Sequence, residues 1–405
     1  MPANTNFLPA LLLSIFALAI LLVIVFGLID RERKRRRLFD QLTPSEIARP
    51  YPQSVVFPAG IRTPQVEPKT AHLVVRTAYA DWLGKFLLPD QEAGQSFLRM
   101  GVEKHHQKFQ VFSTSFGQAL GMLFSVVMAG DDLPAHQRFE RLLAFCLSHP
   151  AADQADLTSW QSMPDNRTAP RQDADPHAEG WIALALLASQ KQWNTSDRFI
   201  LPTILNSRLP ALVAVYESRR QLESMPYLVN SPAFYTVFHQ STANPDWQNL
   251  TQSLKDPSID MLTKKGLGLT GSGEVEESLL ALQLLNSGLD ALWFGQQAQK
   301  DLSGKLLQLA RSRVESFDEH AQPDYSLELQ GKFGSLAQVA CCAPAVMAYG
   351  DQALVDQLWL KLTSIETSKF DPIGSSLRLL ALMLMARVLW PLSDNWQSEP
   401  FETSN

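Results

Sequence analysis

Residues 113–132 read STSFGQALGMLFSVVMAGDD. The first residues are polar, a Gly and a Gln follow, and the remainder is an almost unbroken apolar run that predicts a helix over residues 117–129. A buried helix that starts in this way is typical of an element that presents its first turn to a cleft. Phe116 stands at that point, where a polar or charged side chain would be expected, so its role is the first question that the sequence raises.

The composition favours a large globular domain with an acidic surface. Of the 405 residues, 45% are hydrophobic and 19% are charged, which supplies enough apolar material for a packed core. The net charge is −6, and because Arg31–Arg37 (RERKRRR) contributes +5, the other residues carry −11. A domain this acidic is a poor candidate for nucleic-acid binding, so we expect no nucleic acid among its partners.

A membrane anchor is predicted over residues 8–29. Leu8–Ile29 has no charged residue over 22 positions, which is long enough to cross the hydrocarbon core of a bilayer. The preceding tail, residues 1–7, holds no Lys or Arg, and the basic cluster follows the span. This order favours an uncleaved single-pass anchor over a signal peptide. The positive-inside rule then places the domain that follows in the cytoplasm, with a periplasmic domain as the alternative.

Beyond the anchor, the sequence predicts a linker and one all-α domain. Residues 30–70 contain the basic cluster and many prolines, and they read as a juxtamembrane linker. In residues 71–392, segments with the hydrophobic periodicity of a helix alternate with short breaks rich in Pro, Gly, Asp and Ser. Residues 393–405 are expected to form a tail. Strand signals are almost absent, with HLVVRTAY (72–79) the only ambiguous run. The three cysteines, Cys146, Cys341 and Cys342, show no metal spacing and no disulfide framework.

The helical segments suggest antiparallel hairpins in a closed ring. The candidate helices are 71–88, 117–129, 134–148, 178–192, 198–219, 246–255, 276–289, 291–316, 334–348, 351–365 and 373–390. No short repeat relates them, so an (α/α) barrel is favoured, with a plain helical solenoid as the alternative.

Several motifs, taken in order, resemble the pattern of glycoside hydrolase family 8. The branch that they resemble best is the endo-β-1,4-glucanases found with bacterial cellulose synthases. STSFGQALGM is similar to the family's Ser-Glu-Gly-Gln run and the Gly-Met helix after it. HAEGWIALALLASQKQW (177–193) is similar to its Asp-x-Asp-x-Trp helix. Similar segments are TAYADWLGKFL, NSPAFYTVFHQSTANPDWQNL, GKFGSLAQVACCAPAVMAYGD and DPIGSSLRLLALML. The resemblance covers about residues 75–390 and implies an (α/α)6 barrel that acts on β-linked glucans.

The same resemblance implies that the general acid is missing. Family 8 enzymes generally invert the anomeric configuration, which requires one carboxylic acid and, across the sugar, one carboxylate base. The acid is the Glu of the Ser-Glu-Gly-Gln run, and that position is Phe116 here, while Ser115, Gly117 and Gln118 are retained. Phe116 either packs in the core or lines a remnant cleft. Gln118 is a candidate for substrate binding.

The other carboxylate positions are altered as well. An ungapped match puts Glu179 where the family has a sugar-binding Asp, His177 at the preceding Asp, and Trp181 at the Trp. A slipped match to the DAD run at 173–175 is the alternative. Glu179 also suits the first turn of a helix through its charge. For the base, GSGEVEESLLALQLL offers Glu274 and Glu276 but no Asp, so these are candidate remnants or a charged helix start.

Other kinds of site have little support. Aromatic residues such as Trp160, Trp181, Tyr235 and Trp247 are of the type that stacks on sugar rings, although most should pack in the core. We keep Gln118, Glu179, Trp181 and Tyr235 as candidate substrate-binding residues. No cluster has the spacing of metal ligands, and no phosphate loop is present, so we expect no metal and no cofactor.

Three functions remain open. The first is a catalytically degenerate scaffold or glycan-binding subunit of cellulose-like exopolysaccharide synthesis and secretion. It would be held at a bacterial inner membrane, with polysaccharide synthase or secretion subunits as partners and β-glucan as a possible ligand. The second is an active inverting endo-β-1,4-glucanase with relocated carboxylates. The third is a protein-interaction module that binds no glycan.

Overall fold

The computed structural model describes residues 47–90, 94–105, 108–164, 169, 171–193, 199–221, 231–255, 277–295, 300–317, 334–368, 371–392 and 398–399. The chain divides into two units, Met1–Ile47 and Ala48–Asn405. The described residues belong almost entirely to the second unit. The anchor predicted at residues 8–29 and the basic cluster at 31–37 lie outside them. Within the described residues, no helix combines the length and apolar character that a membrane crossing needs.

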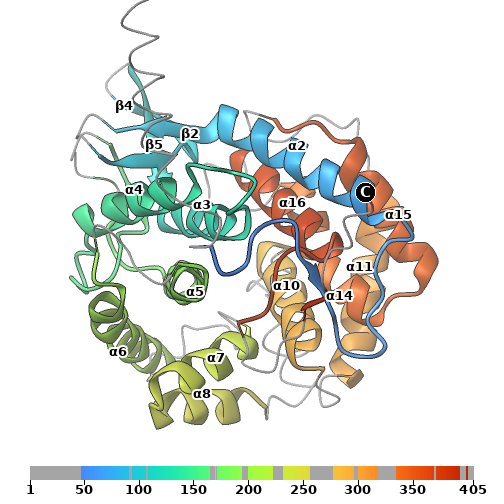
Figure 1. Ribbon diagram of the computed structural model, residues 1–405. Coiled ribbons are helices and arrows are strands. Elements are labelled where there is room, and N and C mark those ends of the chain that lie inside the picture. The colour runs from blue at the N-terminus through green and yellow to red at the C-terminus, as the bar shows by residue number, and fades with distance from the viewer. Residues whose placement is uncertain are drawn as a thin grey trace, which may run out of the picture. The chain divides into compact units, whose positions relative to one another are not determined.

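The second unit is a double ring of helices (Figure 1). The inner ring consists of α3 (Ser115–Val127), α5 (Pro176–Gln192), α7 (Pro232–Thr242), α10 (Glu277–Phe294), the consecutive helices α13 (Ser335–Cys341) and α14 (Ala343–Tyr349), and α16 (Pro372–Met385). The outer ring consists of α4 (Ala135–Ser148), α6 (Leu201–Gln221), α8 (Pro245–Lys255), α11 (Lys300–Ser316), α15 (Gln352–Ser364) and α2 (Pro68–Phe86). Each outer helix packs on an inner one, and α16 packs on α3 to close the ring. This arrangement agrees with the expected (α/α)6 barrel.

Burial explains which helices lie inside. Every residue of α3 is buried, and α5 and α16 are buried along almost their whole length. Their near-continuous apolar sequences suit helices that are covered on all sides. The outer helix α4 instead buries the face that includes Phe139, Leu142 and Leu143, and its polar residues Gln137, Arg138 and Arg141 are only half-buried. The composition of each helix therefore sets its layer.

Side-chain caps define where the inner helices begin. Thr114 accepts a hydrogen bond from the Gly117 N–H at the start of α3, and Asp371 caps α16 in the same way. Asp175 and Ser231 cap α5 and α7. A proline follows the cap in α5, α7 and α16, where its missing N–H costs no helical hydrogen bond.

Several predicted helix boundaries are wrong. The segment predicted as one helix over 334–348 is two helices, since α13 ends at Cys341 and α14 begins at Ala343. Pro344 follows at once and has no N–H for a continuous helix. The helix predicted over 291–316 is divided between α10 and α11. Helix α7 was not predicted as a helix at all.

The three thiols are free and buried. Cys341 and Cys342 lie at the junction of α13 and α14, and Cys146 lies in α4. Burial raises the pKa of Cys146 and that of Cys342 to about 12. Both thiols therefore stay protonated at neutral pH.

The prediction that strands are almost absent is also wrong. Four strands lie between α2 and α3, namely β2 (Leu87–Pro89), β3 (Ser96–Leu98), β4 (Gly101–His105) and β5 (Lys108–Thr114). They form two antiparallel hairpins, and β6 (Gln161–Ser162) extends the second sheet beside β5. The run 72–79, whose sequence is ambiguous between helix and strand, is helical and lies within α2. Strands β2, β3 and β6 have only two or three residues each, which is too few for an alternation to stand out in the sequence.

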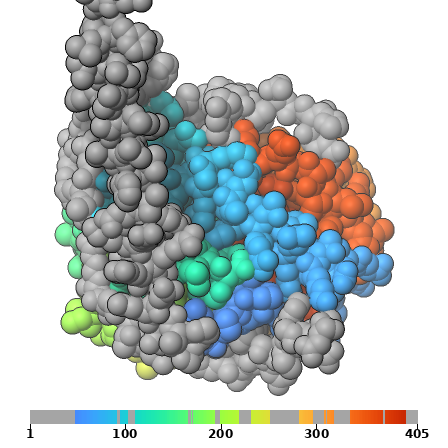
Figure 2. Space-filling view, turned by 45° about the horizontal axis from the view of Figure 1, so that its top comes forward, coloured from blue at the N-terminus to red at the C-terminus, as the bar shows by residue number. Residues whose placement is uncertain are grey.

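The second half of the predicted linker belongs to the barrel unit. From Ala48 onward the chain lies on the helices, and β1 (Ser54–Val55) pairs with β7 (Ser398–Glu399). We call residues 48–66 the strap. Its prolines prevent helix formation but leave its other backbone N–H groups free to bond to helix ends. Figure 2 shows the start of the strap, in dark blue, beside α2, in lighter blue.

Two glycines should respond oppositely to substitution by alanine. A Cβ on Gly288 of α10 would lie 2.3 Å from the Ala345 backbone nitrogen of α14, whereas a Cβ on Gly84 of α2 would meet nothing within 4 Å. We expect Gly288→Ala to lower the free energy of unfolding by about 1–3 kcal/mol through overpacking. Gly84→Ala should raise it by about 0.5–1 kcal/mol. Denaturant unfolding of both variants measures this, and equal effects would contradict the close approach of α10 and α14.

Candidate functional site

The first turn of α3 places Phe116 against helix α5. Phe116 is 7% exposed, and its ring centroid lies 5.0 Å from that of His177 and 6.1 Å from that of Trp181. The Thr114 cap and the bond from the Ser115 N–H to the Trp160 carbonyl (3.0 Å) fix this turn. The position assigned to the general acid is therefore an aromatic contact between two inner helices.

Gln118, two residues further along α3, points to a different neighbour. Its side chain is 1% exposed, and its Oε1 accepts a hydrogen bond from the Leu98 N–H of β3 at 3.3 Å. Residues two apart on a helix point in different directions, and here Phe116 meets α5 while Gln118 bonds to β3. The amide of Gln118 joins α3 to the first hairpin.

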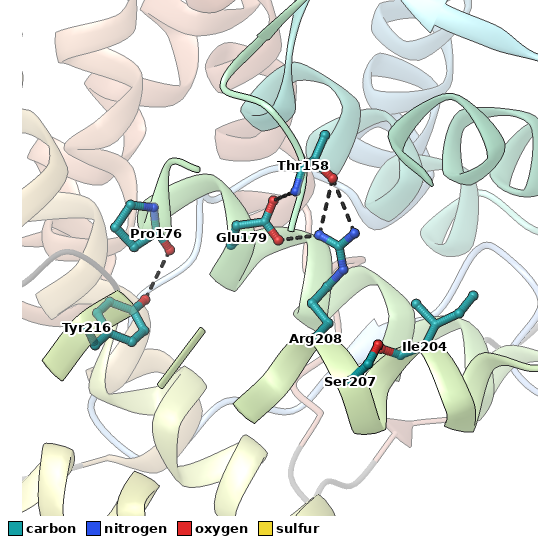
Figure 3. Close-up of polar contacts among 7 residues, drawn as sticks. All are labelled: Thr158, Pro176, Glu179, Ile204, Ser207, Arg208 and Tyr216. Carbon is teal, nitrogen blue, oxygen red and sulfur yellow. Dashed lines mark hydrogen bonds and ion pairs between the residues drawn. The ribbon is translucent and has the colours of Figure 1, made fainter. Parts of the chain in front are cut away.

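Glu179 takes part in a fully buried ion pair. Its carboxylate is completely buried and pairs with the guanidinium of Arg208 from α6 (Figure 3). The second carboxylate oxygen accepts the Thr158 N–H at 2.8 Å, and Arg208 also donates to the Thr158 Oγ1 at 3.2 and 3.3 Å. The three residues thus connect α5, α6 and the loop before β6.

Burial and neighbouring charge act in opposite directions on this carboxyl. Burial raises the pKa of Glu179, while the Arg208 guanidinium and the Thr158 N–H oppose that shift by stabilising the ionised form. The carboxylate of Glu179 bonds to Arg208 and Thr158 inside the protein, and its pairing with Arg208 connects α5 to α6. That Glu179 is a remnant catalytic or sugar-binding carboxylate stays a prediction. The role that this geometry supports is a structural one, the buried ion pair with Arg208.

The two aromatic candidates lie in different clusters. Trp181 is 1% exposed and meets Phe234 of α7 edge to face, with ring centroids 4.9 Å apart. Tyr235 stacks on Trp247 of α8 at 5.8 Å and meets Tyr216 of α6 edge to face at 5.6 Å. Trp181 therefore faces the inner ring beside Phe116, and Tyr235 packs between α7 and the outer helices.

The predicted set does not converge on one point. The structure brings together Phe116 and Trp181, with His177 beside them, while Gln118, Glu179 and Tyr235 each point to a different partner. Glu274 and Glu276 lie outside the described residues. No group of three or more His, Cys, Asp or Glu side chains suited to a metal is found within the described ranges.

Sequence reasoning missed Arg208 and Thr158. Arg208 was visible as a basic residue in the apolar segment LPTILNSRLPALVAVY (201–216), where a charge that turns inward needs an acidic partner. Thr158 gave no comparable signal, because its contribution is one backbone N–H and one hydroxyl in a polar loop.

The fold is similar to that of known polysaccharide hydrolases. A β-1,3-1,4-glucanase from Paenibacillus sp. X4 aligns with a TM-score of 0.66 and 16% identity, over 85% of this chain and 99% of that one. A cold-adapted family 8 xylanase aligns with a TM-score of 0.62 and 15% identity, over 84% of this chain and 98% of that one. At these identities the likeness concerns the fold.

Sequence relatives point to the same group. An endoglucanase from Bacillus sp. (strain KSM-330) is 26% identical over 152 residues, which are 37% of this chain and 33% of that protein. A β-glucanase from Niallia circulans is 26% identical over 151 residues, 36% of this chain and 34% of that protein. The chain spans about a third of the length of these curated relatives, and no family model matches it. The resemblance to family 8 glycoside hydrolases recognised in the sequence is confirmed.

A prediction tests the structural role of Glu179. Glu179→Gln should lower the free energy of unfolding by about 3–5 kcal/mol, because it leaves the Arg208 charge buried without its counter-ion. The matched control is Glu217→Gln on the exposed face of α6, which should change stability by less than about 0.5 kcal/mol. Chemical denaturation of the two variants gives the comparison.

The double variant Glu179→Gln, Arg208→Met extends this test. Removing both charges should recover part of the loss, since the unpaired buried cation is then gone. A Glu179→Gln variant as stable as the parent protein would show that this ion pair does not hold α5 to α6.

Proposed function

We propose that this chain, which has the fold of the family 8 glycoside hydrolases, is a membrane-anchored, non-hydrolytic member of that group. It would serve exopolysaccharide synthesis and secretion as a scaffold or glycan-binding component. Phe116 is the single observation that carries the proposal. The scaffold of the acid motif is kept, and the acid itself is replaced by a phenyl ring packed against His177 and Trp181.

The chemistry of inversion supports this reading. A glycosidic oxygen leaves only when an acid protonates it, and a phenyl ring has no proton to give. Loss of a positioned general acid removes a factor of about 10²–10⁴ from the rate. Glu179, the acidic residue of the α5 motif, is paired with Arg208 and has no exposed surface. A replacement acid would have to come from another part of the chain.

The membrane-bound, cytoplasmic placement is part of the same proposal. Leu8–Ile29 supports a single-pass anchor, and Arg31–Arg37 supports retention of the following residues on the cytoplasmic side. A hydrolase on that side would meet no finished polymer, whereas a subunit of the synthesis machinery would lie beside the enzyme that makes it. Polysaccharide synthase or secretion subunits would then be its partners.

The first test measures hydrolysis. We expect the purified full chain to release no more than trace reducing ends from soluble β-1,4-glucan, because the proton donor is absent. Phe116→Glu should not restore full activity, since a carboxyl at this position still needs a matching base, and Phe116→Ala is the control for changed packing. Robust activity in the unmodified protein would establish the alternative, an active endo-β-1,4-glucanase with relocated carboxylates.

Affinity electrophoresis on the same glucan separates the two non-hydrolytic readings. Retarded migration of the full chain would support a glycan-binding component. Unretarded migration, together with lower polymer output when the gene is deleted, would support a scaffold that works through protein contacts.

The second test concerns topology. Protease added outside intact spheroplasts should leave the barrel uncut if the barrel is cytoplasmic, and detergent should make it sensitive. Replacing the basic residues of Arg31–Arg37 with Gln should weaken this protection, because orientation depends on Lys and Arg near the span. Rapid cutting of the unmodified protein in intact spheroplasts would place the barrel in the periplasm.

A further inference from the structure

The strap bonds to the ends of the inner helices. The Tyr51 N–H donates to the Ala129 carbonyl just after α3 at 2.7 Å, and the Val55 N–H donates to the Arg387 carbonyl just after α16 at 2.8 Å. The Arg62 N–H donates to the carbonyl of Met347 in the last turn of α14 at 2.9 Å. A helix leaves its last carbonyls without internal partners, and the strap supplies a donor to one of these in α14 and to carbonyls of the residues that follow α3 and α16.

Gln192 connects the strap to two inner helices, and we call it the joint. It is the last residue of α5, and its side chain is completely buried. Its amide accepts from the Arg49 N–H and donates to the Arg49 carbonyl, both at 2.8 Å, and also donates to the Val126 carbonyl of α3 at 2.9 Å. The Gln192 carbonyl accepts the Ala48 N–H at 2.9 Å. One residue thus holds the strap, α5 and α3 together.

The same two helices carry the candidate site at their other ends. Phe116 lies in the first turn of α3, and His177 and Trp181 lie in the first two turns of α5. The 13 residues of α3 span about 20 Å at about 1.5 Å per residue, and α3 and α5 pack on each other. A change in spacing at the strap end therefore acts on the contact between Phe116 and α5 through rigid, close-packed elements.

We propose that the strap is a conformational clamp that couples the chain entering the barrel at Ala48 to the site end of α3 and α5. Its attachment at Gln192 and at Arg387, whose Nε donates to the Val55 carbonyl at 2.7 Å, keeps the inner helices at their observed spacing. Release of the strap loosens that spacing and with it the contact of Phe116 with His177 and Trp181. A partner that displaces residues 48–66 would thereby alter the site without touching it.

Hydrogen exchange on the full-length protein in detergent tests this clamp. Gln192→Leu removes the three side-chain bonds of the joint while keeping an apolar side chain. We expect exchange to become about tenfold faster at Ala119–Met122 of α3 and Trp181–Leu184 of α5, as well as at the strap ends of both helices. Gln357→Leu on the outer helix α15 is the matched control and should leave these amides unchanged.

Arg387→Ala is the second variant and covers the case in which Gln192→Leu does not fold. It removes the side-chain bond to the Val55 carbonyl and leaves the backbone bond from the Val55 N–H, whereas Gln192 holds the strap at Arg49. Faster exchange at Trp181–Leu184 in this variant would support coupling through the strap. Faster exchange confined to the last turns of the helices in every folded variant would overturn the clamp. The measurement involves no glycan and no hydrolysis, so its outcome is independent of the proposed function.

Discussion

The charged groups and end carbonyls of the most buried inner helices depend on partners inside the protein, because the closed double ring keeps water away from them. Helix α3 is the clearest case of such burial, since all of its residues are buried. Its first turn is satisfied by the Thr114 hydroxyl, and the Val126 carbonyl near its end by the Gln192 amide. In α5, the charge of Glu179 is matched by Arg208 from the adjacent outer helix. The helix caps, the Glu179–Arg208 ion pair and the strap each supply partners for buried polar groups.

This requirement also shapes the candidate site. A general acid in the first turn of α3 would have to be kept uncharged or solvated in a buried setting, which a working hydrolase arranges because it needs the proton. With Phe116 at this position no buried carboxyl has to be kept uncharged or solvated, and the ring makes aromatic contacts with His177 and Trp181. The substitution therefore fits a barrel that keeps its packing and has no need of acid chemistry, and the proposed non-hydrolytic role follows from it.

The sequence predicted the helical barrel because long apolar periodicities are the strongest local signal, and the order of motifs supplied the family resemblance. It failed where structure depends on partners distant in the chain. Strand β6 of the second sheet has two residues and forms only by pairing with β5 earlier in the chain, and the sequence predicts a linker for the strap because its hydrogen bonds go to helix ends far along the chain. Helix geometry could have improved the site prediction. Glu179 and Trp181 are two residues apart on one helix, so their side chains leave it in different directions, one toward Arg208 and the other toward Phe234.

The junction of α13 and α14 has a practical consequence for work on this protein. Its two adjacent thiols, like that of Cys146, are buried, and the pKa values of Cys146 and Cys342 are raised to about 12. Maleimides and methanethiosulfonates react with the accessible thiolate, so the folded barrel should be almost inert to them. A single cysteine placed on the exposed face of an outer helix would then carry a fluorophore or spin label without prior removal of the native ones. Distances between labelled helices could be followed in a protein whose natural thiols remain in place.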